Sequence, residues 1–319
     1  MRNKKVLITG AAGFIGSNMS ELLIQDNEVV GIDNFSNVDE RFVKPLTHNR
    51  NFVFKKGDIN DPVFMKGLGK FDLVIHLAAN SDVKGGSTDP LLDFRVNAQG
   101  TMGVLEFMRL TDTAQMAFAS SSTVYGEAVQ LPTPETYGPY LPISSYGASK
   151  MAGEGFIAAY SHYYGFKSTM FRFANIVGKN STHGVIFDFI HKLKKDSKSL
   201  EILGDGTQRK SYMHVSDCVN SILFVHEKLS KTDIVNLGNV GTTPVTRIAD
   251  SVTRAMHLEN VKYRFTGGFE GRGWKGDVKV AELSIDKLSS LGWKNSLGSD
   301  AAVDRAVSET LAQLSFQSA

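Results

Sequence analysis

The sequence is poor in the features that mark secreted, membrane-spanning and nucleic-acid-binding proteins. Its 319 residues include a single cysteine, Cys218, which cannot form an internal disulfide. No apolar run reaches about 18 residues and no hydrophobic leader precedes Lys4 and Lys5, so neither a membrane span nor a signal segment is expected. The formal charge of +2 gives no sign of a nucleic-acid or membrane partner. These absences favour a soluble protein of the cytoplasm.

What is present is a repeated alternation of strand-like and helix-like segments. Hydrophobic residues make up 42% of the chain and charged residues 21%, which are ordinary values for a globular protein with a large core. Helical patterns cover residues 90–109 and 146–164, and strands are predicted at Val6–Thr9, Val29–Asp33, Phe52–Lys55, Leu73–Leu77, Gln115–Ser120 and Ser168–Phe171. The alternation predicts an α/β fold of the Rossmann type, a doubly wound parallel sheet that binds its ligands beyond the carboxyl ends of the strands.

The alternation weakens beyond Asn175. We expect residues 1–171 to form the doubly wound domain and residues 172–319 mainly a smaller C-terminal substrate-binding lobe. Strand-like segments at 212–215 and 233–237 predict that this later part of the chain is interleaved with the sheet.

The first strand leads into a glycine-rich turn, Gly10-Ala11-Ala12-Gly13-Phe14-Ile15-Gly16, and a helical pattern follows it. Glycines at this spacing allow a tight turn and the close approach of a pyrophosphate to the N-terminus of the helix. Asp33 ends the next strand, 17 residues after Gly16, where a carboxylate accepts hydrogen bonds from ribose hydroxyls and repels a 2′-phosphate. The pattern predicts NAD rather than NADP. The alternative is that these glycines are ordinary turn residues and Asp33 a helix cap.

A second group of residues points to proton transfer. A serine cluster, Ser120-Ser121-Ser122, follows the fifth strand, and Tyr146 and Lys150 are four residues apart on a predicted helix. A free tyrosine has a pKa of about 10, so it needs nearby cations to act as a base at neutral pH. Lys150 and the positive nicotinamide ring would supply that field, and Tyr146 would take a proton from a substrate hydroxyl. The alternative is a plain surface tyrosine and lysine.

Together these residues resemble the extended short-chain dehydrogenase/reductases, and within them the NAD-dependent nucleotide-sugar epimerases. The resemblance covers nearly the whole chain. Its landmarks are Gly10 to Gly16, Asp33-Asn34, Gly57-Asp58-Ile59, His76 to Ala79, Asn97, Ser121, Tyr146 with Lys150, Arg172 to Asn175, and Gly204 to Arg209.

The resemblance implies a role for each matching residue. Asp58 would bind the adenine amino group, Asn97 would lie near the nicotinamide and order the active-site helix, and His76 is expected to have only a structural role. Asn97 could equally be a plain polar helix residue. The full set implied for the cofactor is Gly10, Gly13, Phe14, Ile15, Gly16, Asp33, Asn34, Asp58, Ile59, Leu77, Ala78, Ala79, Asn97, Tyr146 and Lys150.

For catalysis the resemblance implies Ser121, Tyr146 and Lys150. Dehydratases of this family carry acidic residues at the two positions after the catalytic serine, where this chain has Ser122 and Thr123. Elimination of water is therefore disfavoured. What remains is inversion of a sugar hydroxyl, C4 of a UDP-hexose such as UDP-glucose or UDP-galactose, through a transient 4-keto sugar. UDP-glucuronate or an N-acetylhexosamine substrate, a net nucleotide-sugar oxidoreductase and a non-catalytic NAD-binding protein stay open as alternatives.

The resemblance places the substrate's phosphates and ribose near Asn175, Arg209, Lys210, Arg272 and Asp277, beside Ser121 and Tyr146 at the sugar. The usual later phosphate arginine is displaced by Trp274, so the cation that touches phosphate is undecided, and Trp274 is expected to pack rather than to stack on sugar. Segment 178–184 replaces a more familiar Tyr-Gly-Pro stretch. A homodimer through helices near 93–109 and 147–164 is also implied, with Met151, Phe156, Ile157 and Tyr160 facing either the partner or the core. No metal site is expected.

Overall fold

The computed structural model describes residues 1–316, and the chain divides into two compact units. Each unit is built from three segments of the chain. Unit 1 comprises Met1–Gly126, Gly138–Phe173 and Val219–Val235, and unit 2 comprises Glu127–Tyr137, Ala174–Cys218 and Asn236–Ala319.

Unit 1 is organised around a seven-stranded sheet of order β11-β6-β5-β4-β1-β2-β3. From β3 to β6 in this order, each pair of neighbouring strands is parallel. The strands are β1 (Lys5–Thr9), β2 (Glu28–Asp33), β3 (Phe52–Lys56), β4 (Leu73–His76), β5 (Gln115–Ser121), β6 (Lys167–Phe173) and β11 (Asp233–Leu237). The chain moves outward from β1 to β3 and then returns to β4, so the order reverses beside β1, where doubly wound sheets bind their ligands. The predicted α/β fold is confirmed.

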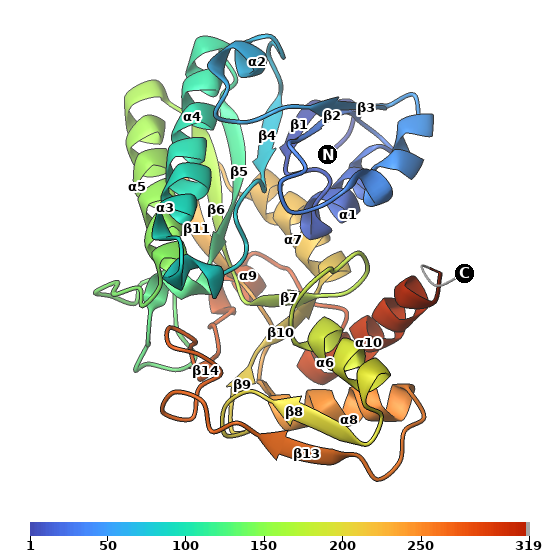
Figure 1. Cartoon of the computed structure of the whole chain (residues 1–319). Helices are drawn as coiled ribbons and strands as arrows, with labels where there is room; N and C mark the ends of the chain where they lie inside the picture. Colours follow the sequence, from blue (N-terminus) through green and yellow to red (C-terminus); the bar gives the residue numbers. More distant parts are fainter. Residues whose placement is uncertain (317–319) are drawn as a thin grey trace. The chain divides into compact units, whose positions relative to one another are not determined.

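Helices cover this sheet on both faces, as Figure 1 shows. The longest is α5, and near its middle Ile157 is fully buried in a core with Val104 and Leu105 of α4 and Met116 of β5. The helical elements of unit 1 are α1 (Phe14–Leu23), η1 (Glu40–Phe42), η2 (Lys44–His48), α2 (Pro62–Lys66), η3 (Gly85–Ser87), α3 (Pro90–Asp93), η4 (Phe94–Gln99), α4 (Gly100–Leu110), η5 (Ser122–Tyr125), α5 (Ser145–Tyr164) and the later part of α7 (Val215–Lys228).

The single helix predicted over 90–109 is interrupted. A π-helical stretch, η4, separates α3 from α4 and contains Asn97. Such insertions are rare and are often found at functional sites, because they turn one side chain out of the regular helical spacing.

Unit 2 packs three helices against short strands. Its core joins Phe189 and Ile190 of α6 to Ile248 of α8 and Val303 of α10. Its elements are β7 (Asn175–Val177), α6 (Val185–Lys195), β8 (Ser199–Ile202), β9 (Arg209–Lys210), β10 (Tyr212–His214), the start of α7, β12 (Thr243–Pro244), α8 (Val245–Ala255), β13 (Lys262–Phe265), β14 (Val280–Ala281), α9 (Asp286–Ser290) and α10 (Ser299–Phe316).

The strand predicted at 212–215 does not enter the large sheet. It forms β10, which pairs with β7 in a separate two-stranded sheet, whereas the segment at 233–237 becomes β11 at the edge of the large sheet. An apolar run indicates a strand but not its partner, because pairing depends on residues far away in the sequence.

Among residues 1–316, no helix is both long and apolar enough to cross a membrane.

Candidate active site

The glycine turn between β1 and α1 leaves no room for a side chain at Gly10 or Gly16. Gly10 has φ +70°, and a Cβ there would lie 2.7 Å from the Ala78 nitrogen. A Cβ on Gly16 would lie 2.0 Å from the Gly10 carbonyl oxygen. Helix α1 begins at Phe14 without a side-chain cap, so its first N–H groups face outward for an acceptor. Bare backbone at a helix N-terminus fits the pyrophosphate of a dinucleotide.

Asp33 lies directly against this turn. Its Oδ2 accepts a hydrogen bond from the Ala12 N–H at 3.1 Å, and its Oδ1 accepts one from the Phe35 N–H at 2.9 Å. Burial raises the pKa of Asp33 above its usual value, although these backbone donors act in the opposite direction. Additional donors, such as ribose hydroxyls, would favour the charged carboxylate.

Asp58 follows β3 and is held by two asparagines. Asn34 Nδ2 donates to its Oδ2 at 2.9 Å, and the Asn60 N–H donates to its Oδ1 at 2.8 Å. Burial acts to raise the pKa of Asp58, but these donors outweigh it and the pKa lies below its usual value. The next residue, Ile59, is buried, and Gly100 of α4 leaves the space for its side chain. The chain thus presents a charged acceptor where the resemblance expects the adenine.

The turn after β4 is fixed by Thr9 of β1. Thr9 Oγ1 accepts hydrogen bonds from the Leu77 N–H at 3.2 Å and the Ala78 N–H at 3.1 Å. It also lies 2.7 Å from His76 Nδ1, and the other ring nitrogen of His76 lies 3.1 Å from Thr101 Oγ1. Burial, with the charge of Lys150, lowers the pKa of His76 to about 3, so the ring is neutral. These contacts hold the turn in place and give His76 a structural role.

Asn97 connects this turn to α5. Its Oδ1 accepts a hydrogen bond from the Asn80 N–H at 2.8 Å, and its Nδ2 donates to Ser149 Oγ at 3.0 Å. Ser149 lies on α5 between Tyr146 and Lys150. The position of Asn97 in the π-helical stretch therefore orders the helix that carries the candidate catalytic pair.

The sequence reasoning missed Asp93, which is fully buried beside the same network. Asn80 Nδ2 donates to its Oδ1 at 2.8 Å, and Ser145 Oγ donates to its Oδ2 at 2.6 Å. Ser145 is the first residue of α5 and precedes Tyr146. The available signal was the spacing of Asp93 and Asn97, which places two polar side chains on one face of a predicted helix.

Ser121 ends β5 and caps the short helix that follows. Its Oγ accepts hydrogen bonds from the Thr123 N–H at 3.2 Å and from Thr123 Oγ1 at 2.9 Å. Since both acceptor positions of the hydroxyl are used, its own proton is directed elsewhere. Ser121 acts to lower the pKa of the Tyr146 phenol, so the two predicted catalytic hydroxyls lie near each other.

Lys150 is buried one helical turn after Tyr146. Its Nζ donates to the Ala119 carbonyl oxygen at 2.9 Å and lies 5.8 Å from the centroid of the Tyr146 ring. Burial lowers the pKa of Lys150 to about 8, against the charges of Asp93 and Glu154. Burial raises the pKa of Tyr146 to about 12, with Ser121 acting to lower it and Asp93 to raise it further. Without the cofactor, the pKa of Tyr146 therefore lies above the range of a base at neutral pH.

A buried ion pair lies one turn further along α5. Arg172 donates from Nε to Glu154 Oε1 at 2.9 Å and from NH2 to Oε2 at 2.6 Å. Ser120 Oγ donates to the same carboxylate at 2.5 Å. Arg172 is fully buried, and its guanidinium lies 4.7 Å from the centroids of both the Tyr125 and Tyr140 rings. Ser120 is therefore a structural partner of Glu154, and the neighbouring Ser121 stays available.

The candidate substrate residues lie in unit 2. Lys210 Nζ donates to Asp277 Oδ1 at 2.6 Å, and both side chains are largely buried. Arg209 is exposed, because successive side chains of a strand point to opposite faces. Arg272 forms an ion pair with Glu127. Asn175 begins β7, and its Nδ2 donates to the Ser211 carbonyl oxygen at 3.3 Å.

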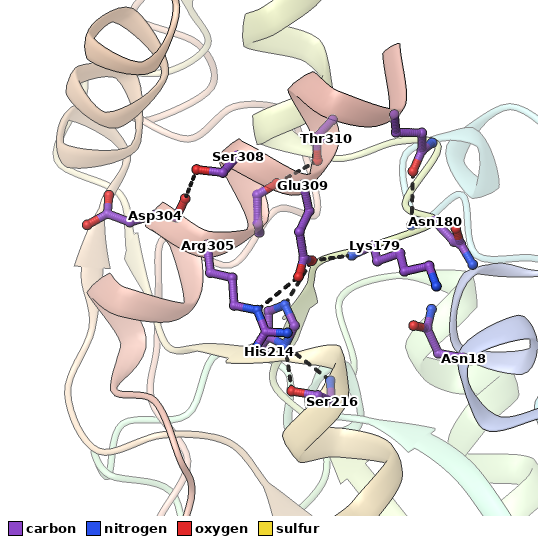
Figure 2. A network of polar contacts seen from close by, with 12 residues as sticks. Asn18, Lys179, Asn180, His214, Ser216, Asp304, Arg305, Ser308, Glu309 and Thr310 are labelled. Atoms are coloured by element: carbon purple, nitrogen blue, oxygen red, sulfur yellow. Dashed lines mark hydrogen bonds and ion pairs between the residues drawn. The ribbon is translucent and has the colours of Figure 1, made fainter. Parts of the chain in front are cut away.

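The unusual segment 178–184 is attached to α10, as Figure 2 shows. Glu309 Oε2 accepts a hydrogen bond from the Lys179 N–H at 2.7 Å and lies 3.0 Å from His214 Nε2. Gln313 Oε1 accepts one from the Asn180 N–H at 3.0 Å. Burial acts to raise the pKa of Glu309, but its partners His214 and Arg305 outweigh it and the pKa is lowered. The C-terminal helix thus fixes the loop that follows β7.

In the described part of the chain, no group of three or more His, Cys, Asp or Glu side chains is placed to hold a metal ion.

A doubly wound sheet with a glycine turn before its first helix, an acid at the end of its second strand and a Ser-Tyr-Lys set defines a class of NAD-dependent enzymes. The family model for NAD dependent epimerases and dehydratases matches residues 6–238, so the chain belongs to that family. The predicted NAD cofactor and the predicted NAD-dependent nucleotide-sugar 4-epimerase activity are confirmed.

Several relatives and solved structures are similar over nearly the full length. A Mycolicibacterium smegmatis UDP-glucose 4-epimerase is 34% identical over 87% of this chain and 95% of its own. A Methanocaldococcus jannaschii protein, whose name as a UDP-glucose 4-epimerase is provisional, is 32% identical over 95% of this chain and 97% of its own. The crystal structure of a UDP-galactose 4-epimerase is 37% identical, with a TM-score of 0.87, and covers 97% of this chain and 99% of its own.

Proposed function

We propose that this protein interconverts UDP-glucose and UDP-galactose by inverting the C4 hydroxyl of the sugar. The observation that carries the proposal is the proximity of Ser121 to the Tyr146 phenol, with Ser122 and Thr123 where a dehydratase would carry acids. With no carboxylate to protonate a leaving hydroxyl, the set supports oxidation and re-reduction of one carbon. The resemblance to UDP-sugar epimerases supplies the choice of nucleotide and sugar.

The residues of unit 1 would hold the cofactor. The backbone from Gly10 to Gly16 would bind the pyrophosphate, Asp33 the adenosine ribose and Asp58 the adenine, while Leu77 to Ala79 and Asn97 would border the nicotinamide. When bound, NAD supplies a hydride acceptor and then a hydride donor for C4, together with the positive charge of its oxidised ring.

The side chains of this chain would carry out the proton transfer. Tyr146 Oη would take the proton of the C4 hydroxyl and return it to the same oxygen when hydride is delivered to the opposite face of the 4-keto sugar. Ser121 would donate a hydrogen bond to the reacting oxygen, since Thr123 already uses the acceptor positions of its hydroxyl. Lys150, whose pKa of about 8 leaves it mostly charged at neutral pH, would favour the phenolate.

The substrate's nucleotide would be bound by unit 2. Lys210 and Asp277 would contact the phosphates and the ribose, with Asn175 and Arg272 as further donors. Arg209 is the weaker candidate, because its side chain points to the opposite face of β9 from Lys210.

The test is direct. Purified protein incubated with UDP-glucose should form UDP-galactose, detected by chromatography. No net release of NADH should accompany the conversion. Stoichiometric NADH release would identify a net oxidoreductase, and conversion only of UDP-glucuronate or of an N-acetylated UDP-hexose would reassign the sugar. The Tyr146→Phe variant should lose activity by about 10²–10⁴-fold while retaining NAD. Full activity in that variant would contradict the mechanism.

The proposal includes a homodimer in the cytoplasm. Ile157 lies in the core, but Phe94 of η4 is 57% exposed and Phe156 and Tyr163 of α5 are 39% and 73% exposed, which leaves apolar surface for a partner. Phe156→Asp should yield a monomer by sedimentation, and Val240→Asp, at an exposed apolar residue of unit 2, should not. A dimer that survives Phe156→Asp would place the interface elsewhere.

A further inference from the structure

Two buried hydrogen-bond donors near Asp277 have no acceptor. Four buried side-chain polar atoms lack a hydrogen-bond partner among residues 1–316, and two of them, Arg272 Nε and Trp274 Nε1, lie within three residues of each other. A buried donor left unsatisfied is unfavourable, because it gives up its hydrogen bond to water without gaining another. Two such donors in one short segment, with no acceptor among the described residues, point to an acceptor from outside the chain.

The neighbouring carboxylates are already engaged. Asp277 accepts from Lys210 Nζ at 2.6 Å and from the Gly273 N–H at 3.2 Å. Glu127 and Glu270 form ion pairs with the terminal nitrogens of Arg272 rather than with its Nε. Lys210 Nζ lies 5.8 Å from the centroid of the Trp274 ring, so the cation and the indole belong to one cluster.

The chemistry of the two orphan groups selects the ligand. Both are N–H donors, and an anionic phosphate oxygen accepts hydrogen bonds without bringing a donor of its own that needs a partner. A hydroxyl would bring such a donor. Trp274 also stands where the family resemblance expects a phosphate-binding arginine, and indole retains an N–H donor while giving up the charge.

We propose that Trp274 is a substrate-binding residue, whose indole N–H donates, together with Arg272 Nε–H, to the diphosphate of the nucleotide sugar. The inference rests on the proposed function, because it takes a nucleotide sugar as the ligand. In this proposal a neutral indole N–H makes the phosphate contact that a charged arginine makes elsewhere in the family. Trp274 then binds substrate in addition to packing.

The chain provides a matched control. It has only two tryptophans, and the other, Trp293, donates from Nε1 to Asn295 Oδ1 at 2.8 Å within unit 2. The holoenzyme is titrated calorimetrically with UDP and with uridine. Trp274→Phe should weaken UDP binding about tenfold, which corresponds to 1.4 kcal/mol, and leave uridine binding unchanged. Trp293→Phe should bind UDP within about twofold of the parent, and Trp274→Arg should restore UDP binding.

A spectroscopic measurement complements the affinities. In the Trp293→Phe protein the only indole is Trp274, so its fluorescence should change on saturation with UDP but not with uridine. Unchanged UDP affinity in Trp274→Phe, or equal losses for UDP and uridine, would overturn the diphosphate contact while leaving the proposed function intact. Failure of the parent protein to bind UDP or any UDP-sugar would instead remove the proposed function itself.

Discussion

The Ser145 hydroxyl donates a hydrogen bond to the buried carboxylate of Asp93 at 2.6 Å, at the first turn of the helix that carries Tyr146 and Lys150. The negative charge of Asp93 acts to raise the pKa of both Tyr146 and Lys150. The anion favours the neutral phenol of Tyr146 over the phenolate. The same charge favours the protonated form of Lys150.

Asp93→Asn should move the acidic limb of the pH dependence of kcat/KM to lower pH. Removing the charge lowers the pKa of Tyr146, so the phenolate is reached at lower pH. The amide keeps an oxygen for Ser145 or Asn80, and thermal unfolding of the variant checks that the fold survives. An unchanged or alkaline-shifted limb would contradict an electrostatic role of Asp93.

Removing NAD should raise the pKa of Tyr146. Burial places that pKa at about 12 in the chain alone, and the positive nicotinamide ring is the cation that would bring it down. Tyrosinate absorbance of the parent minus that of Tyr146→Phe, recorded with NAD bound and after its removal, isolates this one phenol. Equal titration midpoints in the two states would show that the cofactor does not activate Tyr146.

Removing Arg172 alone should destabilise the fold much more than removing both members of the Glu154–Arg172 pair. Arg172→Met leaves a buried carboxylate without its main partner and should lower the free energy of unfolding by about 3–5 kcal/mol. The double variant Glu154→Leu with Arg172→Met removes both charges and should recover a large part of that loss. Chemical denaturation of the single and double variants completes the cycle, and additive losses would mean that the pair is not coupled.

Acid should destabilise the protein through two buried histidines. Burial lowers the pKa of both His76 and His226 to about 3, and the charges of Lys150 and Lys167, respectively, act in the same direction. A histidine in the unfolded chain titrates near its usual value of 6.5. Between these values the unfolded chain binds more protons, so stability present above pH 6.5 is lost as the pH falls toward 3. Each histidine contributes a slope of up to about 1.4 kcal/mol per pH unit.

The measurement is the free energy of unfolding between pH 7 and the acid transition. His226→Gln retains polar partners for Thr169 and Gln115 and should reduce the slope by up to about 1.4 kcal/mol per unit in this range. A slope equal to that of the parent would mean that His226 is protonated in the folded protein.

Much of the cofactor half could be predicted because its signals are local. The glycine turn, the acid at the end of the second strand and the spacing of Tyr146 and Lys150 are short patterns whose periods fix which residues share a face. The strands they follow have nearly the predicted bounds, from β1 at Lys5–Thr9 to β6 at Lys167–Phe173.

What the sequence could not assign depends on contacts between distant parts of the chain. Asp93 has no motif of its own and acquires its role only because Asn80 and Ser145 close around it. Trp274 resembles a packing residue by type, and only the lack of an acceptor for its buried nitrogen separates it from one. The partner of β10 could not be predicted either, since one apolar strand is compatible with several neighbours.

The division of the chain has a consequence for how the protein can be cut. Because each unit is assembled from three separated segments, no continuous fragment contains one whole unit without residues of the other. Truncation at residue 171 or 173 removes Val219–Val235 from unit 1 and, with it, strand β11 at the edge of the large sheet. A cofactor-binding fragment would therefore have to join the three separated segments of unit 1 directly. Truncation of the chain at one end would not produce it.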